Sequence, residues 1–309
     1  MFSQEYIQWD KFLLFLKAMF AVVVWGASFI ATKVALKDVE PITVVWLRFA
    51  IGVLILGITV VRRRQFCLPE RNEFIYFGVL GFLGITFHQW LQSTGLITSK
   101  ASTTAWIVAT TPLFIAILGW IFLKERLIRT QVLGIGLATL GVLLVISEGD
   151  LSSLSIGRFG NEGDKLIIIS ALNWAVFSVI SRKGLEHHPA ALMMFYVMAI
   201  GWLILSVAFF VGSNQYDLQS LSYSGWLGVL FLGIFCSGIA YVFWYDALKS
   251  LLASQVGVFL YFEPLVAVLV AAFLLGEPIL LASMVGGGII LLGVWMVNRS
   301  SLVKKRLLD

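Results

Sequence analysis

The sequence contains an internal repeat, because a stretch near the middle of the chain recurs in the same register close to the C-terminus. Each matched residue has its counterpart 152 residues later, as Pro112 has Pro264 (264 − 112 = 152). The matched pairs are Ala101-Ser102 with Ala253-Ser254, Pro112 with Pro264, Glu125 with Glu277, Gly134 with Gly286, Gly136 with Gly288, and Gly141-Val142 with Gly293-Val294. A proline, a glutamate and three glycines in constant register predict a duplicated structural unit.

Lipid is predicted to be the solvent for most of this chain. Of the 309 residues, 60% are hydrophobic and only 13% are charged, which is more apolar surface than a soluble domain can bury. A membrane-spanning helix requires about 20 mostly apolar residues. Ten segments meet this requirement, at approximately 13–36, 43–61, 74–97, 101–123, 130–147, 164–183, 190–212, 225–248, 252–275 and 279–298. The predicted fold class is therefore all-α integral membrane, with ten transmembrane helices.

The repeat and the polar connections divide the chain into four parts. Residues 1–147 are predicted to form a first five-helix repeat, and residues 164–298 a second one. Residues 148–163, which are polar and rich in Gly and Ser, read as a linker between the repeats. Residues 299–309 form a basic tail.

The orientation in the membrane follows from the positions of Lys and Arg near the helix ends. Loops on the cytoplasmic side carry an excess of these residues. The side that holds the N-terminus carries fifteen of them, and the opposite side carries five, which are Lys33, Lys37, Lys100, Arg158 and Lys165. Both termini are therefore predicted to be cytoplasmic, and the linker faces outward.

The two repeats are predicted to lie upside down relative to each other. Each has an odd number of spans, so the second copy enters the membrane from the other side. Glu125 then lies at a cytoplasmic helix end, and Glu277 lies at an outer one. A weaker match, Phe82-Leu83-Gly84-Ile85 with Phe231-Leu232-Gly233-Ile234, supports the same alignment. Inverted repeats of this kind are typical of alternating-access transporters.

Three stretches of the sequence resemble a known family. They are Thr111-Pro112-Leu113 through Leu123-Lys124-Glu125, its copy Glu263-Pro264-Leu265 through Leu275-Gly276-Glu277, and Arg48-Phe49. With the following glycines, they resemble EamA-type proteins of the drug/metabolite transporter superfamily. The resemblance implies a ten-helix carrier with a central cavity, lined mainly by helices 1, 3, 4, 6, 8 and 9. It implies no particular substrate, since members move amino acids, other metabolites and drugs.

Glu263 is the first candidate for substrate binding. Its helix is expected to start near Leu252, and about 11 residues at 1.5 Å each place the carboxylate roughly 16 Å deep. A charge at that depth costs about 2.5–3.5 kcal/mol on insertion scales and usually faces a wet cavity or a partner. Gln255 lies on the same helix face, and Thr111 is the repeat equivalent of Glu263. We therefore expect Glu263 to bind a cationic group or a proton; the alternative is a structural hydrogen bond beside Pro264.

Further polar and proline residues within the spans are candidates for the cavity wall and its hinges. His88 and Gln92 share one helix face with Gly84, which indicates cavity lining or hydrogen bonding between helices. Pro112 and Pro264 each remove a backbone hydrogen bond, so they predict either paired gating hinges or fixed bends.

Aromatic residues within the spans are candidates for ligand stacking. Trp25 and Trp174 are repeat equivalents well inside the first and sixth spans, and Trp106 lies on the polar face of the fourth. Such rings bind aromatic or cationic ligands. Trp residues also collect at the membrane interface for lipid reasons, which is the alternative.

Other polar groups are expected to have structural roles. Glu125 and Glu277 each precede the next helix by a few residues, so each is expected to cap that helix. The repeated glycines are expected to permit close helix packing. Arg48 is expected to reach outward or to pair with a carboxylate. Asp246 is expected to pair with Lys249.

A membrane transporter is the function that these features favour. Export of amino acids or related metabolites through a central cavity comes first, and proton-coupled efflux of cationic or aromatic drugs is the alternative. A carrier of phosphorylated or nucleotide-linked sugars is third, and a membrane receptor or scaffold is the alternative outside transport. No catalytic, metal-binding, cofactor-binding or nucleic-acid-binding pattern is recognisable, and Cys67 and Cys236 have no metal or redox spacing. The expected partners are a small-molecule substrate, the lipid bilayer and, in the alternative, protons, and the expected location is a bacterial inner membrane.

Overall fold

The structure is a computed structural model that describes residues 2–122, 127–150, 160–251 and 256–306. Those residues form helices joined by short connections, and the described ranges contain no strand. The helices before residue 150 are α1 (Phe2–Ala35), α2 (Pro41–Arg62), α3 (Arg71–Gly81), the π-helix η1 (Phe82–Phe87), α4 (His88–Thr98), α5 (Ala101–Val108), α6 (Thr111–Phe122) and α7 (Arg129–Ile146). The later ones are α9 (Glu162–His187), α10 (Ala190–Val211), the 3-10 helix η2 (Asn214–Ser220), α11 (Tyr223–Leu230), the π-helix η3 (Phe231–Ile239), α12 (Ala240–Ser250), the 3-10 helix η4 (Val258–Phe262), α14 (Glu263–Leu275) and α15 (Leu281–Arg306).

Eight continuous helical stretches in the described ranges are long and apolar enough to cross a membrane. They are Phe12–Ala35, Pro41–Arg62, Arg71–Thr98, Ala101–Phe122, Arg129–Ile146, Glu162–His187, Ala190–Val211 and Tyr223–Lys249. Two shorter apolar helices follow, Phe259–Leu275 and Leu281–Val297. The predicted all-helical membrane fold is therefore confirmed, and the count of ten transmembrane helices stays a prediction.

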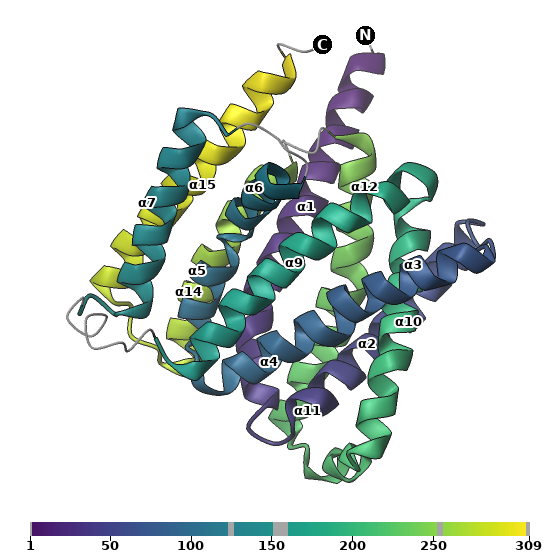
Figure 1. Ribbon diagram of the computed structural model, residues 1–309. Helices are drawn as coiled ribbons and strands as arrows, with labels where there is room; N and C mark the ends of the chain where they lie inside the picture. The colour runs from purple at the N-terminus through teal and green to yellow at the C-terminus, as the bar shows by residue number, and fades with distance from the viewer. Residues whose placement is uncertain (1, 123–126, 151–159, 252–255, 307–309) are drawn as a thin grey trace.

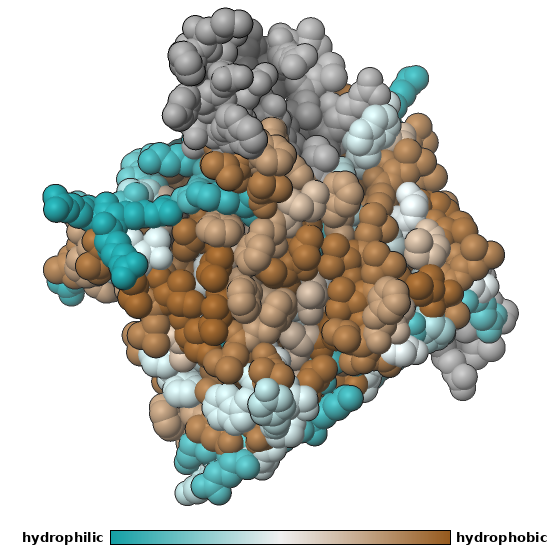
Figure 2. Space-filling model, turned by 180° about the vertical axis from the view of Figure 1, so that it is seen from behind, coloured by the Kyte–Doolittle hydropathy of each residue, from teal (hydrophilic) through white to brown (hydrophobic). Residues whose placement is uncertain are grey.

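The surface has the pattern that a bilayer requires. Figure 2 shows apolar residues across the middle of one face, with hydrophilic residues gathered toward the upper and lower ends. Large apolar side chains such as Leu54, Val211 and Phe273 are exposed on the surface of the helices. Because lipid tails are as apolar as these side chains, no exposure cost arises in a membrane. The chain begins and ends at the same end of the bundle (Figure 1), which we call the terminal end; the other is the opposite end.

Helix ends follow local sequence signals. Pro41 occupies the first turn of α2, where a missing N–H costs nothing. The side chain of Asn161 accepts a hydrogen bond from the backbone N–H of Asp164 and so caps α9. Gly276 ends α14 in the left-handed conformation, at φ +65°, which glycine adopts without strain.

Helix packing relates the two halves of the chain. α7 packs against α15, and α2 against α10. The contact between α4 and α9 has its counterpart in the contact between α12 and α1. In the same way, the contact between η1 and α10 has its counterpart in that between η3 and α2. α14 packs against α1 as α6 does against α9. Each of these pairs thus has its equivalent when the first half is exchanged for the second.

The contact between α7 and α15 depends on the repeated glycines. A Cβ atom added at Gly134 would lie 2.6 Å from the carbonyl oxygen of Gly293, and one added at Gly141 would lie 2.6 Å from that of Gly286. The absent side chains therefore let the two backbones touch. Gly136 and Gly288, from the same repeat, have open space at that position. The expectation of close packing was wrong for these two glycines, because they point away from the contact.

Both copies of the Phe-Leu-Gly-Ile match begin a π-helical segment, η1 in the first half and η3 in the second. A π-helix leaves backbone carbonyls without their usual partners, and side chains from the other half bind two of them. The amide of Asn173 in α9 donates to the carbonyl of Leu83 (2.7 Å). The indole of Trp25 in α1 donates to the carbonyl of Cys236 (3.0 Å). The irregular segments are therefore held by the first helix of the opposite half.

The repeated prolines coincide with breaks in their helices. α5 ends at Val108 and α6 begins at Thr111, one residue before Pro112. The hydroxyl of Thr111 donates to the carbonyl of Val108 (2.7 Å), the group that Pro112 leaves without a backbone donor. In the second copy, η4 changes to α14 at Glu263, directly before Pro264. Both prolines therefore lie at breaks in their helices, and the use of these breaks as hinges stays a prediction.

Candidate functional site

Glu263 lies where η4 changes to α14, close to the backbone of α1. A Cβ atom added at Gly26 would lie 2.6 Å from the carbonyl oxygen of Glu263, so only glycine permits this approach. The Glu263 side chain is half-buried. Within the described ranges its carboxylate has no hydrogen bond and no ion pair. A carboxylate without a protein partner inside a span is free to bind a ligand or a proton.

Aromatic rings gather on α1 and α12 beside Gly26. The Trp25 ring lies 5.7 Å from that of Tyr241, edge to face, and 5.2 Å from that of Trp244. Tyr241 is buried, and its hydroxyl has no hydrogen-bond partner in the part of the chain that the structure describes. Trp25 is thus placed by its bond to Cys236 and presents ring surface next to the backbone that contacts Glu263.

His88 of α4 and Trp174 of α9 form a second pair of rings that joins the two halves. Their rings lie 4.7 Å apart, and the His88 Nδ1 is 2.9 Å from the hydroxyl of Ser170. Gln92 lies one turn further along α4, is buried, and has no hydrogen-bond partner among the described residues. One nitrogen of His88 therefore has a structural partner, while the amide of Gln92 is available.

Arg48 connects these two groups. Its Nε donates to the hydroxyl of Ser237 (3.0 Å), and its Nη1 donates to the side-chain oxygen of Gln89 (3.1 Å). Gln89 is the neighbour of His88, and Ser237 is the neighbour of Cys236. Only 5% of Arg48 is exposed, and it forms no ion pair in the described ranges. The expectation that it reaches outward or pairs with a carboxylate was wrong, because neutral acceptors on α4 and η3 hold it inside.

The remaining candidates lie elsewhere. Trp106 is buried between α5, α7 and α15, where its ring packs against Gly287 and its N–H has no hydrogen-bond partner among the residues that the structure describes. The hydroxyl of Thr111 is occupied by the carbonyl of Val108. Gln255 lies outside the described residues. The structure therefore brings the backbone of Glu263 to Gly26, next to Trp25, and brings His88 to Trp174, and Arg48 binds a neighbour of each group. Sequence reasoning missed Gln89 and Ser237, which no pattern in the chain singled out.

The chain matches the model of the EamA-like transporter family twice, over residues 13–147 and 161–299. The chain belongs to the EamA-like transporter family. An uncharacterized transporter of Archaeoglobus fulgidus is 28% identical over 277 residues, which cover 90% of this chain and 94% of the relative. The uncharacterized transporter YyaM of Bacillus subtilis is 28% identical over 270 residues, covering 87% and 88%.

A solved structure, described only as the crystal structure of a protein, has the same fold. It aligns with a TM-score of 0.61 at 20% identity, over 92% of this chain and 96% of the other. This likeness concerns the fold alone. The family and the named relatives show that this EamA-like protein is a membrane transporter, which confirms the predicted family.

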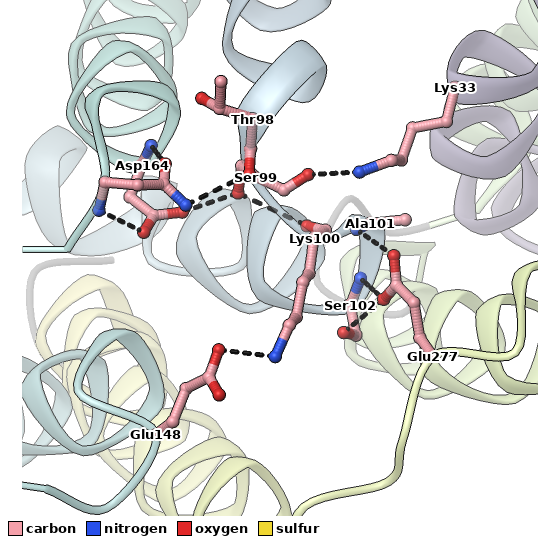
Figure 3. A network of polar contacts seen from close by, with 10 residues as sticks. Lys33, Thr98, Ser99, Lys100, Ala101, Ser102, Glu148, Asp164 and Glu277 are labelled. Carbon is pink, nitrogen blue, oxygen red and sulfur yellow. Dashed lines mark hydrogen bonds and ion pairs between the residues drawn. The ribbon is translucent and has the colours of Figure 1, made fainter. Parts of the chain in front are cut away.

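A polar network closes the opposite end of this EamA-like fold (Figure 3). The carboxylate of Glu277 accepts hydrogen bonds from the backbone N–H groups of Ala101 (2.8 Å) and Ser102 (3.1 Å) and from the hydroxyl of Ser102 (2.7 Å). Glu277 is therefore a helix cap, as expected, but it caps α5 in the other half and not the following helix. Its repeat equivalent, Glu125, lies outside the described residues.

The rest of the network surrounds the connection between α4 and α5. The ammonium of Lys33 donates to the carbonyl of Ser99 (2.6 Å), and the Ser99 hydroxyl donates to the carboxylate of Asp164 (2.6 Å). Lys100 pairs with Glu148 (2.5 Å). Asp164 and Ser99 are buried, so the bond between them is shielded from solvent. Groups from both halves meet at this single connection.

A second set of contacts between the halves lies toward the terminal end. Asp246 of α12 pairs with Lys17 of α1 (2.9 Å) and with Arg63 at the end of α2 (2.6 Å). The expectation that Asp246 pairs with Lys249 was wrong, because α1 and α2 bring two other cations to the carboxylate. Asp246 therefore joins the second half to the first.

Proposed function

We propose that this protein exports small metabolites, amino acids or related compounds, by alternating access through a central cavity between two inverted five-helix halves. The matched packing of equivalent helices supports the inverted arrangement. The proposed location is a bacterial inner membrane with both termini cytoplasmic, supported by the fifteen-to-five distribution of Lys and Arg and by the relative in Bacillus subtilis.

The free carboxylate of Glu263 is the observation that carries this proposal. Polar groups inside a membrane protein are normally paired, because an unpaired one costs free energy in the low dielectric. Glu263 has no partner among the described residues, and Trp25 and Gln92 are further candidates for the wall of the same cavity. Its occupant in the proposal is the ammonium group of a substrate, or a proton when the cavity is empty.

Alternating access requires contacts between the halves that form at one end while those at the other end break. The Glu277 network at the opposite end and the Asp246 ion pairs toward the terminal end are the proposed contacts of this kind. The helix breaks at Pro112 and Pro264 are the proposed hinges, since each lies between a short segment and the longer helix that follows it.

Substitution of Glu263 by Gln tests the proposal. The purified full chain is reconstituted in liposomes, and uptake of a panel of radiolabelled amino acids and amines is measured. The wild type is expected to move at least one of them, and E263Q to lose about tenfold or more of the rate, since a charge-assisted hydrogen bond contributes about 1.5–3 kcal/mol.

Glu40→Gln is the matched control for this experiment. Glu40 is exposed before α2, and its side chain makes no capping bond, so the same chemical change should leave transport unaltered. Equal rates and equal pH profiles for the wild type and E263Q would exclude Glu263 from the mechanism. The absence of flux for every compound would favour the receptor or scaffold.

Proton-coupled efflux of cationic or aromatic compounds is the second candidate. The ring group of Trp25, Tyr241 and Trp244 favours it, because cations bind over aromatic faces and Gly26, next to Trp25, contacts the backbone of Glu263. Quaternary ammonium compounds in the same panel distinguish this candidate. They carry no carboxylate, so they compete well only if a cation is the whole recognition element.

A further inference from the structure

Arg48 is a buried cation for which the described residues supply no counter-ion. Its guanidinium donates hydrogen bonds to the neutral oxygens of Ser237 and Gln89, through Nε and Nη1. No carboxylate lies within ion-pair distance among the described residues. A guanidinium has five N–H donors, and Nη2 has no partner in the described part of the chain. A cation inside a span is costly, so its charge is expected to serve a ligand.

The hydrogen bonds of Arg48 hold the guanidinium in one place. Gln89 is the second residue of α4, directly after the π-helical η1, and Ser237 lies within η3, so the acceptors lie beside one irregular segment and inside the other. The carbon of the guanidinium also lies 5.1 Å from the centre of the Phe49 ring. Because the side chain is fixed on three sides, a ligand that binds it loses little additional freedom.

A short series of contacts links Arg48 to the backbone of Glu263. Ser237, which Arg48 binds, follows Cys236, whose carbonyl accepts the indole N–H of Trp25. Gly26, the residue after Trp25, contacts the backbone of Glu263. Arg48 and Glu263, neither of which has an ionic partner among the described residues, are therefore linked through Trp25 and Gly26 of α1.

We propose that Arg48 binds a carboxylate of the substrate, so that the substrate is a zwitterion whose ammonium group faces Glu263. This inference rests on the proposed transport function and specifies its substrate class. A planar guanidinium matches a carboxylate with two parallel hydrogen bonds. A phosphorylated substrate fits less well, because a single arginine does not balance two negative charges next to Glu263. A purely cationic substrate would leave the positive charge of Arg48 without a counter-ion.

Three probes with one carbon skeleton separate the two charges: phenylalanine, 3-phenylpropionate, which lacks the ammonium, and phenethylamine, which lacks the carboxylate. Leucine, 4-methylpentanoate and isoamylamine form a second set with an aliphatic side chain. Binding to the purified full chain is measured by thermal stabilisation, and uptake is measured in liposomes. The wild type is expected to prefer a zwitterion to both of its single-charge analogues.

Arg48→Gln is expected to lower the affinity for the zwitterion and for the carboxylate probe by about 10- to 100-fold, because a charge-assisted hydrogen bond to the carboxylate is lost. The affinity for the amine should not change. Arg48→Lys keeps the charge but lacks the planar guanidinium, so its affinity for the zwitterion should lie between those of the wild type and R48Q. E263Q should show the reverse selectivity, losing the amine and keeping the carboxylate probe. A purely structural Arg48 would instead lower the affinity for all probes equally.

The outcomes separate this inference from the proposed function. If amines are transported and depend on Glu263, while R48Q matches the wild type for every probe, the role of Arg48 is overturned and transport stands. If neither zwitterion binds the wild type, the substrate class is overturned. If no compound in either panel moves through any variant, the proposed function fails as well. Size-exclusion profiles and melting temperatures of the variants exclude misfolding as the cause.

Discussion

Replacing Glu277 by Ala is expected to lower the free energy of unfolding by about 2–4 kcal/mol and to open the opposite end of the transporter. The substitution removes three hydrogen bonds to one carboxylate, which join the second half to the start of α5. Charge-assisted bonds contribute about 1.5–3 kcal/mol each, but their effects overlap when one group makes all of them. The N–H groups of Ala101 and Ser102 also lose the anion that suits a helix N-terminus.

The native Cys236 reports the opening. Its side chain is fully buried in η3 beside Ser237, whereas Cys67 is exposed and is first replaced by Ser. A membrane-impermeant thiol reagent added on the side predicted to be outer should label Cys236 severalfold faster in E277A than in the parent. Labelling is followed by mass spectrometry, and stability by thermal unfolding in detergent.

Glu148→Gln is the control at the same end. Glu148 pairs with Lys100, and both side chains are substantially exposed, so this pair is worth at most about 1 kcal/mol. We expect its labelling rate and its melting temperature to match the parent. If E277A were less stable but Cys236 reacted no faster, Glu277 would be a structural cap without a role in closing this end.

The partner of Glu277 shows why part of the structure could not be read from the sequence. A carboxylate a few residues before a helix normally caps that helix, and this was the expectation. The capped residues lie 175 and 176 positions away in the chain and meet Glu277 only because the halves pack against each other. The type of interaction was predictable from local chemistry, and its partner required the tertiary arrangement.

The fold was more accessible to sequence reasoning than the site. Long apolar runs specify membrane helices because lipid leaves the backbone no other partner, so most helices were predicted close to where they are observed. The first and last helices were predicted too short, because α1 begins at Phe2 and α15 continues through the predicted tail to Arg306. Glu263 stood out because its repeat equivalent is Thr111, and a charge within a span is unusual. Arg48 was noticed, but its contacts with Gln89 and Ser237 cross between helices and have no sequence signature.

The repeated glycines contain a signal that could have separated their roles. Gly134 and Gly141 are seven residues apart, which places them on the same helix face. Gly136 is two residues from Gly134, about 200° around the helix, and so faces away. The structure agrees, since only the first two contact α15. Helical spacing within the motif therefore predicts packing better than the presence of glycine.

Gly134→Ala is expected to destabilise the transporter, whereas Gly136→Ala is expected to be neutral or slightly stabilising. The new methyl group at position 134 would lie 2.6 Å from the Gly293 carbonyl and 3.1 Å from the Cβ of Met296, so α7 and α15 must separate. Overpacking of this kind costs about 1–3 kcal/mol, and Gly134→Leu should cost more. At position 136 nothing lies within 4 Å, and alanine favours helix over glycine by about 1 kcal/mol.

The repeat supplies an independent second measurement of the same effect. A Cβ at Gly286 would lie 2.8 Å from the Gly141 carbonyl, whereas one at Gly288 meets open space. Thermal unfolding of the four alanine variants in one detergent should therefore give two pairs with the same order, in which 134 and 286 melt lower than 136 and 288. Because each pair differs only in the helix face that carries the methyl group, helix propensity and hydrophobicity cancel between its members. Equal melting temperatures within a pair would mean that α7 and α15 do not touch at these glycines, and the packing of α7 against α15 would have to differ from that described.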